Sequence, residues 1–586
     1  MSQPDKAEKV QRLCMRRGFF WPAYEIYGGV AGLLTWGPLG VILKNKIKDL
    51  WRRYFVYKHG FVEIDSPNIA PYIVFKASGH VDSFKDIMVS CLSCGNKYRA
   101  DTLLSEHGIE ISEALKPSEI EKIIQDNNVR CPQCGGELGE ATYFMTMFQT
   151  TIGPYTEAKG FLRPETAQGM FTEFKRVYEA MRRRFPIGIA QIGRGFRNEI
   201  SPRQGPIRLR EFDMMELEMF IDPSDPVCPY IDQYREEKLN LLHEALIRVG
   251  KTEGYETMSV QEALDKKIIV NEWMAYFMVL AKKFMEKLGI PAEKQRFREK
   301  LEGERAHYAT QTFDQEVYLS RWGWVEVSGH AYRGDYDLQA HIKHSGMDLY
   351  VDKKLKVPKK VKEVSIVPKA DEIKRKFGEK IRDIMKALHR DDTWKNELLE
   401  KGYTEIAGVK LGKNFFDIKE SVKDVYVEKL VPHVVEPSFG LDRIAYAVLE
   451  YSYREVNGRI VLSLPIPVRV YDCAVFPLVS EEKLIKEAID IKHRLESKGF
   501  MILYDDKDSI GRRYARVDEI GIPVAITIDK ETLENDTVTV RDRDTWKQYR
   551  ISKYEVDVFL STLFTTESFE VTVKKLCLEN KIVAPK

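Results

Sequence analysis

The pattern of apolar and polar positions changes several times along the chain. Residues 41–55 repeat apolar side chains at the spacing of one helical face, with lysines and arginines off that face, which predicts an amphipathic helix. Residues 62–65 and 186–194 have the composition of strands, and residues 12–40, rich in aromatics and glycine, predict a packed loop region.

A hairpin is predicted around residues 195–220. Residues 201–206 are turn formers, and after them Glu216 and Glu218 alternate with Met215, Leu217 and Met219, so a strand here has both carboxylates on one face. Arginines at the strand ends are suited to bind a phosphate or carboxylate through two parallel hydrogen bonds, and a buried glutamate to bind an amine. For charged strands in general, a solvated hairpin is the alternative.

The pattern changes again after the proline-rich residues 465–467. Three predicted strands alternate with two predicted helices, which is typical of a compact α/β domain that begins at residue 468. The strands are expected at 468–476, 500–504 and 522–528, with a further one at 538–540, and the helices at 480–498 and 511–520.

Length and composition indicate a large globular protein. A chain of 586 residues is too long to fold around a single hydrophobic core, so several domains or large insertions are expected. Its content of 44% hydrophobic and 11% aromatic residues is that of a globular protein and not of a disordered one. The net charge of +2 does not indicate a nucleic-acid partner, so any RNA contact must come from local patches. The longest uncharged run, residues 28–43, is short and interrupted by glycine and proline, and no signal peptide is visible, so a cytoplasmic protein without a membrane span is expected.

Four of the eight cysteines form two CxxC pairs, each followed by glycine. The pairs are separated by 36 residues that include a predicted helix at 118–125. Four thiolates close a tetrahedral zinc site with no position left for water, so a structural zinc is predicted, with isolated reduced cysteines as the alternative. The predicted ligands are Cys91, Cys94, Cys131 and Cys134.

Two further segments have a less specific pattern. Residues 222–305 show helical patches and no chemistry that the sequence reveals. A lysine-rich run is either a solvated surface or a contact for nucleic-acid phosphates. Its lysines are Lys343, Lys353, Lys354, Lys356, Lys359, Lys360, Lys362, Lys369, Lys374, Lys376 and Lys380.

Several motifs resemble those of one family. FRNE at 196–199 with RLREF at 208–212 resembles motif 2 of the class II aminoacyl-tRNA synthetases, in the form found in glycyl-tRNA synthetases of the archaeal and eukaryotic type. EPSFGLDR at 436–443 resembles motif 3, and LRPETAQG at 162–169 and KASGHVDSF at 76–84 resemble further segments of that family. The helix at 41–55 with its following strand resembles motif 1, although an ordinary core helix has the same spacing.

The resemblance implies an α+β fold. An antiparallel-sheet catalytic core with helical insertions and a C-terminal α/β anticodon-binding domain are expected, and motif 1 implies a homodimer. The expected parts are catalytic core at 1–90, 141–221, 306–342 and 416–464, a zinc-knuckle insertion at 91–140, insertions at 222–305 and 343–415, and the anticodon-binding domain at 468–586.

The resemblance also implies the reaction. Such an enzyme activates glycine with ATP to glycyl-adenylate and pyrophosphate, then transfers glycine to the 3'-terminal ribose of tRNA(Gly). Arg197 is expected on the α-phosphate, Glu199 on the adenine amine, Phe212 stacked on adenine, and Arg443 on the outer phosphates. The full expected ATP site is Arg197, Asn198, Glu199, Arg208, Leu209, Phe212, Glu326, Val327 and Arg443, of which Arg197, Glu326 and Arg443 are the expected catalytic residues.

Magnesium and glycine have their own expected residues. Glu326, on a predicted strand face, is expected to bind magnesium with ATP, and Glu436 is assigned both to magnesium and to glycine. Every competing amino acid is larger than glycine, so two carboxylates around one ammonium select it by steric exclusion. The expected glycine pocket is Glu165, Glu216, Arg333, Glu436, Pro437 and Ser438.

Two other functions fit parts of the pattern. A nucleic-acid-binding subunit with this fold but without catalysis is expected to lose the arginines and glutamates named above, yet all are present. A class II synthetase for another small amino acid is disfavoured because LRPETAQG and EPSFGLDR occur together with the glycyl-type motif 2.

Overall fold

The computed structural model describes residues 5–109, 111, 115–154, 158–202, 205–306, 308–390, 393–578 and 582–583. Its contacts divide the chain into two compact units. The first comprises residues 1–349 and 432–586, and the second residues 350–431. No helix in the described ranges combines the length and apolar character needed to cross a bilayer.

A nine-stranded sheet forms the centre of the first unit. Its strand order is β13-β12-β14-β15-β16-β21-β11-β10-β3, and all neighbours are antiparallel except β10 with β3 and β12 with β14. The strands are β3 (Val62–Glu63), β10 (Ile187–Phe196), β11 (Glu211–Ile221), β12 (Lys238–Leu242), β13 (Glu256–Ser259), β14 (Gln295–Glu299), β15 (Gln311–Leu319), β16 (Gly323–Gly334) and β21 (His433–Gly440). The predicted hairpin is confirmed, since β10 and β11 pair from Ile187 with Phe220 to Phe196 with Glu211, while Arg203 and Gln204 of its loop lie outside the described residues.

Three helices form the main core with one face of this sheet. They are α2 (Pro38–Phe55), α10 (Glu272–Lys287) and α15 (Leu441–Ser452). Pro38 at the first helical position starts α2, and its apolar stripe packs with Met215 and Leu217 of β11. Asn271 caps α10 by accepting hydrogen bonds from two backbone amides, and 11 of the 16 residues of this helix are buried.

The opposite face of β11 bears the acidic side chains. Helix α7 (Ala167–Ala180) follows strand β9 (Lys159–Leu162), and Phe174 of α7 stacks on Phe220 of β11 with ring centroids 4.3 Å apart. Because side chains alternate along a strand, Glu216 and Glu218 are on the same face as Phe220. Both glutamates are buried, so the solvated-hairpin alternative is wrong.

Two sequence-based expectations need correction. Residues 222–305 show more than helical patches, because β12, β13 and β14 extend the central sheet and α10 lies in its core. The loop predicted over residues 12–40 is wrong at its start, where helix α1 (Lys6–Arg17) is capped by the Asp5 side chain and ends at Gly18 with φ 76°. Strands β1 (Phe20–Pro22) and β2 (Leu34–Trp36) then pair across the remaining loop.

The CxxC pairs belong to a small module with its own apolar cluster. Strands β5 (Lys85–Cys91), β6 (Lys97–Arg99) and β7 (Leu138–Met145) form its sheet, with helices α5 (Ala100–Glu106) and α6 (Pro117–Asp126) beside it. The helix predicted at 118–125 is confirmed as α6.

The C-terminal residues of the first unit form the predicted α/β domain. Its sheet order is β25-β24-β26-β27-β28-β29, with β24 parallel to β25 and β26. The strand predicted at 468–476 starts only at Cys473, because residues 466–468 form a 3-10 turn that Arg469 fixes by bonding to the Ile466 carbonyl and to Asp472. The elements are β24 (Cys473–Pro477), α16 (Glu482–Ser497), β25 (Ile502–Tyr504), α17 (Ile510–Ile520), β26 (Val524–Ile528), α18 (Lys530–Asn535), β27 (Thr537–Asp542), β28 (Gln548–Ser552), α19 (Val556–Thr566), α20 (Phe569–Leu578) and β29 (Ile582–Val583). The predicted α+β class, an antiparallel core with this added domain, is confirmed.

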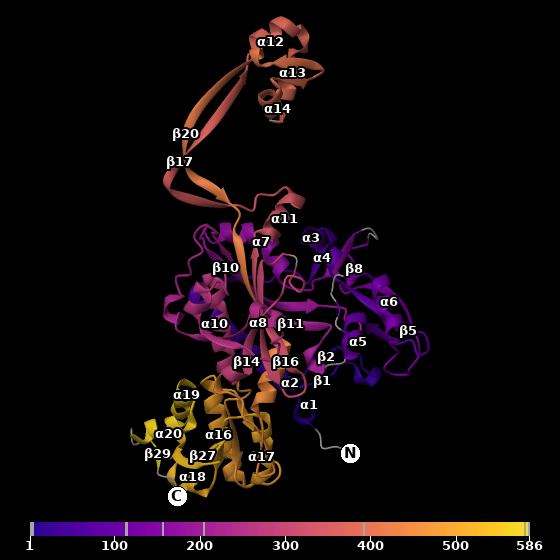
Figure 1. Ribbon diagram of the computed structural model, residues 1–586. Helices are drawn as coiled ribbons and strands as arrows, with labels where there is room; N and C mark the ends of the chain where they lie inside the picture. Colours follow the sequence, from indigo (N-terminus) through magenta and orange to yellow (C-terminus); the bar gives the residue numbers. More distant parts are fainter. Residues whose placement is uncertain are drawn as a thin grey trace. The chain divides into compact units, whose positions relative to one another are not determined.

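The second unit is a two-stranded ribbon leading to a small domain (Figure 1). Strands β17 (Val351–Pro368) and β20 (Phe416–Leu430) pair antiparallel from Val351 with Leu430 to Pro368 with Phe416, with a bulge after Lys354. Helices α12 (Ala370–Phe377), α13 (Ile381–Leu388) and α14 (Thr393–Lys401) and strands β18 (Tyr403–Ile406) and β19 (Val409–Gly412) complete the unit. Ile373, Leu398 and Phe416 are among the residues of its separate apolar core.

Candidate active site

A cavity lies over strands β11, β15, β16 and β21. Its larger part has a volume of about 610 Å³ and shares Arg197, Glu199 and Glu326 with a smaller part beside motif 3. Most of the predicted site residues are brought together here. They are Glu165, Arg197, Glu199, Arg208, Leu209, Phe212, Glu216, Glu326, Val327, Glu436, Ser438 and Arg443.

Three predicted residues are not on the cavity wall. The backbone amide of Asn198 donates to the Thr146 carbonyl over 2.7 Å, which fixes the end of β10. Pro437 lies in β21 opposite His330, and Arg333 is only 1% exposed behind the wall. These residues shape the site from behind.

Glu216 is held at the inner end of the cavity. Its Oε2 accepts from the Thr166 amide over 2.6 Å and from the Thr166 hydroxyl, and its Oε1 accepts from Ser438 Oγ over 2.7 Å. Burial raises the pKa of Glu216, and the nearby charge of Glu165 raises it further. The predicted neighbours Glu216 and Ser438 are therefore in direct contact.

Glu165 faces Glu216 from the turn before α7. His80 Nε2 lies 3.2 Å from Glu165 Oε1, Gln168 Nε2 donates to the same oxygen over 3.2 Å, and Arg333 Nη2 lies 3.5 Å away. Burial alone would raise the pKa of Glu165, but the charges of His80 and Arg333 outweigh it and lower the pKa below its usual range. Glu165 is thus an ionised carboxylate in a buried pocket.

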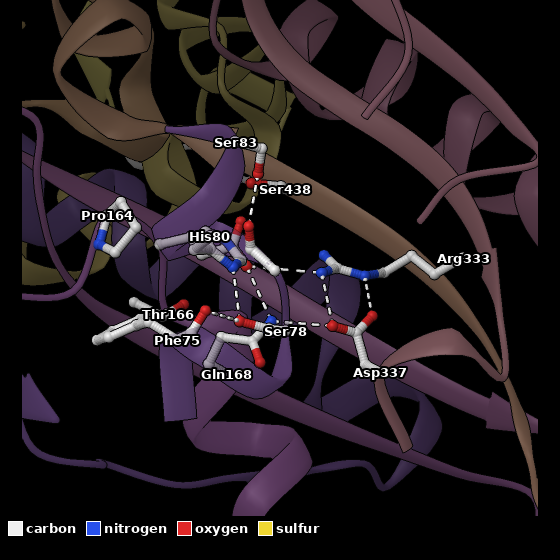
Figure 2. A network of polar contacts seen from close by, with 12 residues as sticks. Phe75, Ser78, His80, Ser83, Pro164, Thr166, Gln168, Arg333, Asp337 and Ser438 are labelled. Atoms are coloured by element: carbon white, nitrogen blue, oxygen red, sulfur yellow. Dashed lines mark hydrogen bonds and ion pairs between the residues drawn. The ribbon is translucent and has the colours of Figure 1, made fainter. Parts of the chain in front are cut away.

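Arg333 connects the acids behind the wall. It donates to Asp337 over 2.9 Å and to Glu436 over 2.7 Å, and its guanidinium lies 3.8 Å from the centroid of the Tyr308 ring. Figure 2 shows Arg333 facing Asp337, to which Gln168 also donates over 3.0 Å. This frame fixes Glu165 and Glu436 relative to each other.

Glu436 has an unusual charge state. Burial raises its pKa to about 7, with Glu216 and Glu165 adding to the rise and Arg333 opposing it. Its deprotonated form therefore becomes dominant only near neutral pH.

The outer part of the cavity is rich in arginine. Arg197 lies between two aromatic rings, 5.7 Å from the centroid of Phe84 and 5.5 Å from that of Phe212, and its Nε donates to the Pro164 carbonyl over 3.2 Å. Among the described residues Arg197 forms no ion pair with a carboxylate. Its charge is therefore positioned for a ligand.

Two ion pairs line the same outer part. Arg208 donates to Glu199 over 2.8 Å through Nε, so a ligand that uses Glu199 has to share or displace this contact. Arg443 Nη1 lies 3.2 Å from Glu326 Oε2 and donates to the Glu326 carbonyl over 2.9 Å, while its Nε donates to the Ile207 carbonyl.

Lys300 and Asp314 were not predicted as site residues, and Glu218 was predicted only as a carboxylate on the same strand face as Glu216. Lys300 and Asp314 line the cavity 3.1 Å apart, and burial, with a smaller effect of Glu326, raises the pKa of Asp314 to about 7. Glu218 is fully buried with neither carboxylate oxygen bonded to another described residue, and burial raises its pKa well above the usual value. The sequence feature that could have identified Glu218 as a site residue is its position two residues after Glu216, on the same face of the strand.

These residues create a cavity with two chemical ends. Glu165, Glu216 and Glu436 form an acidic inner end, while Arg197, Arg208, Arg443 and Lys300 give the outer end positive charge. A small inner carboxylate pocket is suited to an ammonium group, and the outer cations to phosphates. The cavity fits a small amino acid joined to, or beside, a nucleotide.

The four predicted zinc ligands form a separate cluster. Their sulfur atoms all lie within 4.8 Å of one another, with Cys91 Sγ 3.5 Å from Cys134 Sγ and Cys94 Sγ 3.7 Å from Cys131 Sγ. Four thiolates about 2.3 Å from a tetrahedral zinc ion are roughly 3.8 Å apart, so the cluster fits zinc. His341 is not part of such a group; it is buried and bonds to Gln168 Oε1.

Comparisons with known proteins agree with these features. The model of the anticodon binding domain family matches residues 472–563. The chain is 49% identical to the glycine–tRNA ligase of Aeropyrum pernix, over 94% of this chain and 96% of that protein. It is 46% identical to the glycine–tRNA ligase of Pyrococcus abyssi, over 94% and 97%, and 40% identical to that of Methanocaldococcus jannaschii, over 95% and 99%.

Proposed function

The chain belongs to the glycine–tRNA ligases, and on this premise we propose that the cavity with its acidic inner end and cationic outer end is the site where it activates glycine. As a member of this family it is an aminoacyl-tRNA synthetase that charges tRNA(Gly) with glycine, with ATP as the energy source. The observation that supports the site is the continuity of the two ends, because the reaction joins an amino acid to a nucleotide.

The inner end binds glycine. Glu165 and Glu216 accept its ammonium group, and Ser438, bonded to Glu216, closes the pocket. Thr166 and Ser438 hold Glu216 in place, so a larger side chain would have to displace bonded, buried groups. Glycine is thereby selected by size, and no second hydrolytic site is needed.

The outer end binds ATP. Phe212 stacks on adenine and Glu199 accepts its amine, while Arg208 and Arg443 bind the outer phosphates and Leu209 and Val327 shape the nucleotide pocket. Asn198 supports this pocket through its backbone bond to Thr146. Arg197 grips both the glycine carboxylate and the α-phosphate, so the attacking oxygen and the phosphorus are held together as negative charge develops. Positioning and electrostatic stabilisation then provide most of the rate.

Synthetases use magnesium with ATP, and the residues favour Glu326 as its protein ligand. Glu326 lines the phosphate end, and magnesium there would neutralise phosphate charge. Glu436 is a poorer ligand because its Oε2 is bonded to Arg333 over 2.7 Å, and a cation at that place would be repelled. We therefore assign Glu436, with Arg333 and Pro437, to the glycine side.

Other parts of the chain have supporting roles. The four cysteines bind one structural zinc, and residues 468–586 bind the anticodon, as the match to the anticodon binding domain family suggests. The insertions are 91–140, 222–305 and 343–415, and the lysine-rich one contacts tRNA phosphates. The core segments are 1–90, 141–221, 306–342 and 416–464, except that residues 416–430 form β20 and belong to the second unit.

The protein acts as a cytoplasmic homodimer built through α2. Exposed apolar side chains precede this helix, with Tyr24 62%, Ile26 87% and Tyr27 84% exposed, which favours a covered surface in the assembly.

ATP–pyrophosphate exchange tests the site. Purified protein without tRNA should exchange with glycine and not with alanine or serine, and the Arg197→Ala variant should lose most of that exchange. Exchange with alanine at a similar rate would contradict steric selection. If folded, unaltered protein shows no exchange with any of these amino acids, the result would favour a nucleic-acid-binding subunit without catalysis.

A further inference from the structure

A buried group of charges lies beside the ATP site, where Asp213 and Asp442 border the smaller part of the cavity. Lys44 of α2 is 7% exposed, Asp442 of α15 4%, and Asp213 of β11 9%. Ionised groups are buried only when they are paired, because the loss of hydration is costly. The three residues come from three elements that are far apart in the sequence, so their pairing fixes those elements relative to one another.

Asp442 is the centre of this group. Its Oδ1 accepts from Lys44 Nζ over 2.6 Å and from Trp36 Nε1 over 2.5 Å, and its Oδ2 accepts from the backbone amide of Asp213 over 2.6 Å. Lys44 also lies 3.2 Å from Asp213 Oδ2 and 4.8 Å from the centroid of the Trp36 ring. Because three donors bond to this one short side chain, the Asp442 carboxylate is held in a single position.

Asp442 and its partner Asp213 are each next to a proposed ATP residue in the sequence. Asp442 directly precedes Arg443, and Asp213 directly follows Phe212. Arg443 reaches the cavity from the first turn of α15 and bonds there to the Ile207 and Glu326 carbonyls. A shift of that first turn would therefore move the guanidinium away from the phosphates.

We propose that Asp442 is a positioning residue for Arg443, and that through Lys44 and Trp36 it makes a well-formed ATP site depend on the placement of helix α2 and strand β2. Asp442 borders the smaller part of the cavity, but both of its carboxylate oxygens are already bonded to Trp36, Lys44 and the Asp213 amide. It acts by holding the start of α15 against β11 at Asp213. This inference rests on the ATP-binding role proposed for Arg443.

A double-mutant cycle tests it, with ATP affinity measured by titration calorimetry on the full-length protein. Asp442→Asn keeps the size of the side chain and removes its charge. We expect it to weaken ATP binding at least tenfold while the glycine KM changes less than threefold. In the Arg443→Ala background the same change should alter ATP affinity less than twofold, because the residue that it positions is already absent.

The matched control is Lys48→Gln. Lys48 pairs with Asp213 over 2.9 Å but does not contact Asp442, so ATP affinity should stay within twofold of the unaltered protein. If Asp442→Asn does not fold, Trp36→Phe removes one donor to Asp442 with a smaller change, and a threefold loss is expected.

The outcomes separate the two proposals. A tenfold loss that persists in the Arg443→Ala background, or no loss at all, overturns the positioning role. Unchanged ATP affinity in Arg443→Ala alone overturns the proposed ATP role of Arg443, and the positioning role with it.

Discussion

Acids of the same kind have different charge states at the inner end of the cavity. The pKa of Glu165 is lowered because the opposing charges of His80 and Arg333 outweigh its burial, whereas burial raises the pKa values of Glu216 and Glu436. Glu165 is therefore the carboxylate that stays ionised over the widest pH range. It should contribute most to binding an ammonium group.

Substitution of Glu165 tests this ranking. Glu165→Gln removes the ionised partner of the glycine ammonium, so the glycine KM should rise by about 10- to 100-fold, the range expected for one charge-assisted hydrogen bond. The ATP KM should change less than threefold. Glu173→Gln, an exposed glutamate on the same helix α7, is the control and should leave both values unchanged. A rise in both KM values would indicate a general loss of structure.

Glu436 gives a pH dependence that can be measured. Burial raises its pKa to about 7, so it is largely neutral at pH 6 and ionised at pH 8. Glycine enters as an ammonium ion and prefers the ionised carboxylate, so its KM should fall about five- to tenfold as pH rises from 6 to 8. Glu436→Gln should flatten this profile. An equally steep profile in the variant would assign the titration to another group.

The sequence predicted which residues line the site but not their charge states. Motif spacing was enough to place Arg197, Glu216 and Arg443 at one cavity. The pairing of Lys300 with Asp314 depends on the register of β15, and the burial of Glu218 on the cover given by α7. Neither is visible without the fold, because both depend on contacts between distant segments.

At the scale of elements, local signals predicted helices better than strands. The bounds of α2, α6 and α17 differ from the predictions by a few residues, since each has a clear apolar stripe. The strands β12, β13 and β14 were not predicted, because each has at most five residues and is stabilised by pairing rather than by a periodic pattern.

The four-cysteine module gives a prediction at this scale. Purified protein should contain one zinc per chain, and Cys94→Ser should reduce this to below about one-tenth, because a site with three thiolates binds the ion far less tightly. Limited proteolysis should then cut faster between residues 85 and 145, where the module is small and depends on the metal. Cys228→Ser, outside the cluster, should keep the zinc. Zinc retained in Cys94→Ser would mean that the ion is bound elsewhere.

At the scale of the whole molecule, charge is unevenly divided. Residues 350–431 contain 21 lysines and arginines against 15 aspartates and glutamates, a net charge of +6, while the whole chain has only +2. The remainder is therefore acidic, at −4. This division cannot be seen from the overall net charge. The second unit has its own apolar core, so its basic residues belong to one folded part.

This division leads to a prediction for tRNA binding. Lys354, Lys359, Lys360 and Lys362 are exposed on β17, and changing all four to glutamine should raise the KM for tRNA about tenfold at low salt and make it less sensitive to salt, because fewer counterions are released on binding. ATP–pyrophosphate exchange with glycine should remain within twofold, since the cavity lies wholly in the first unit.

A matched set of substitutions distinguishes a specific contact from a general loss of charge. Lys251, Lys266, Lys267 and Lys294 are also exposed, and changing them to glutamine alters the net charge by the same amount. If the ribbon contacts tRNA phosphates, only the β17 variant should lose salt sensitivity. If both variants weaken tRNA binding equally, long-range attraction rather than contact explains the effect, and the lysines of β17 form only a solvated surface.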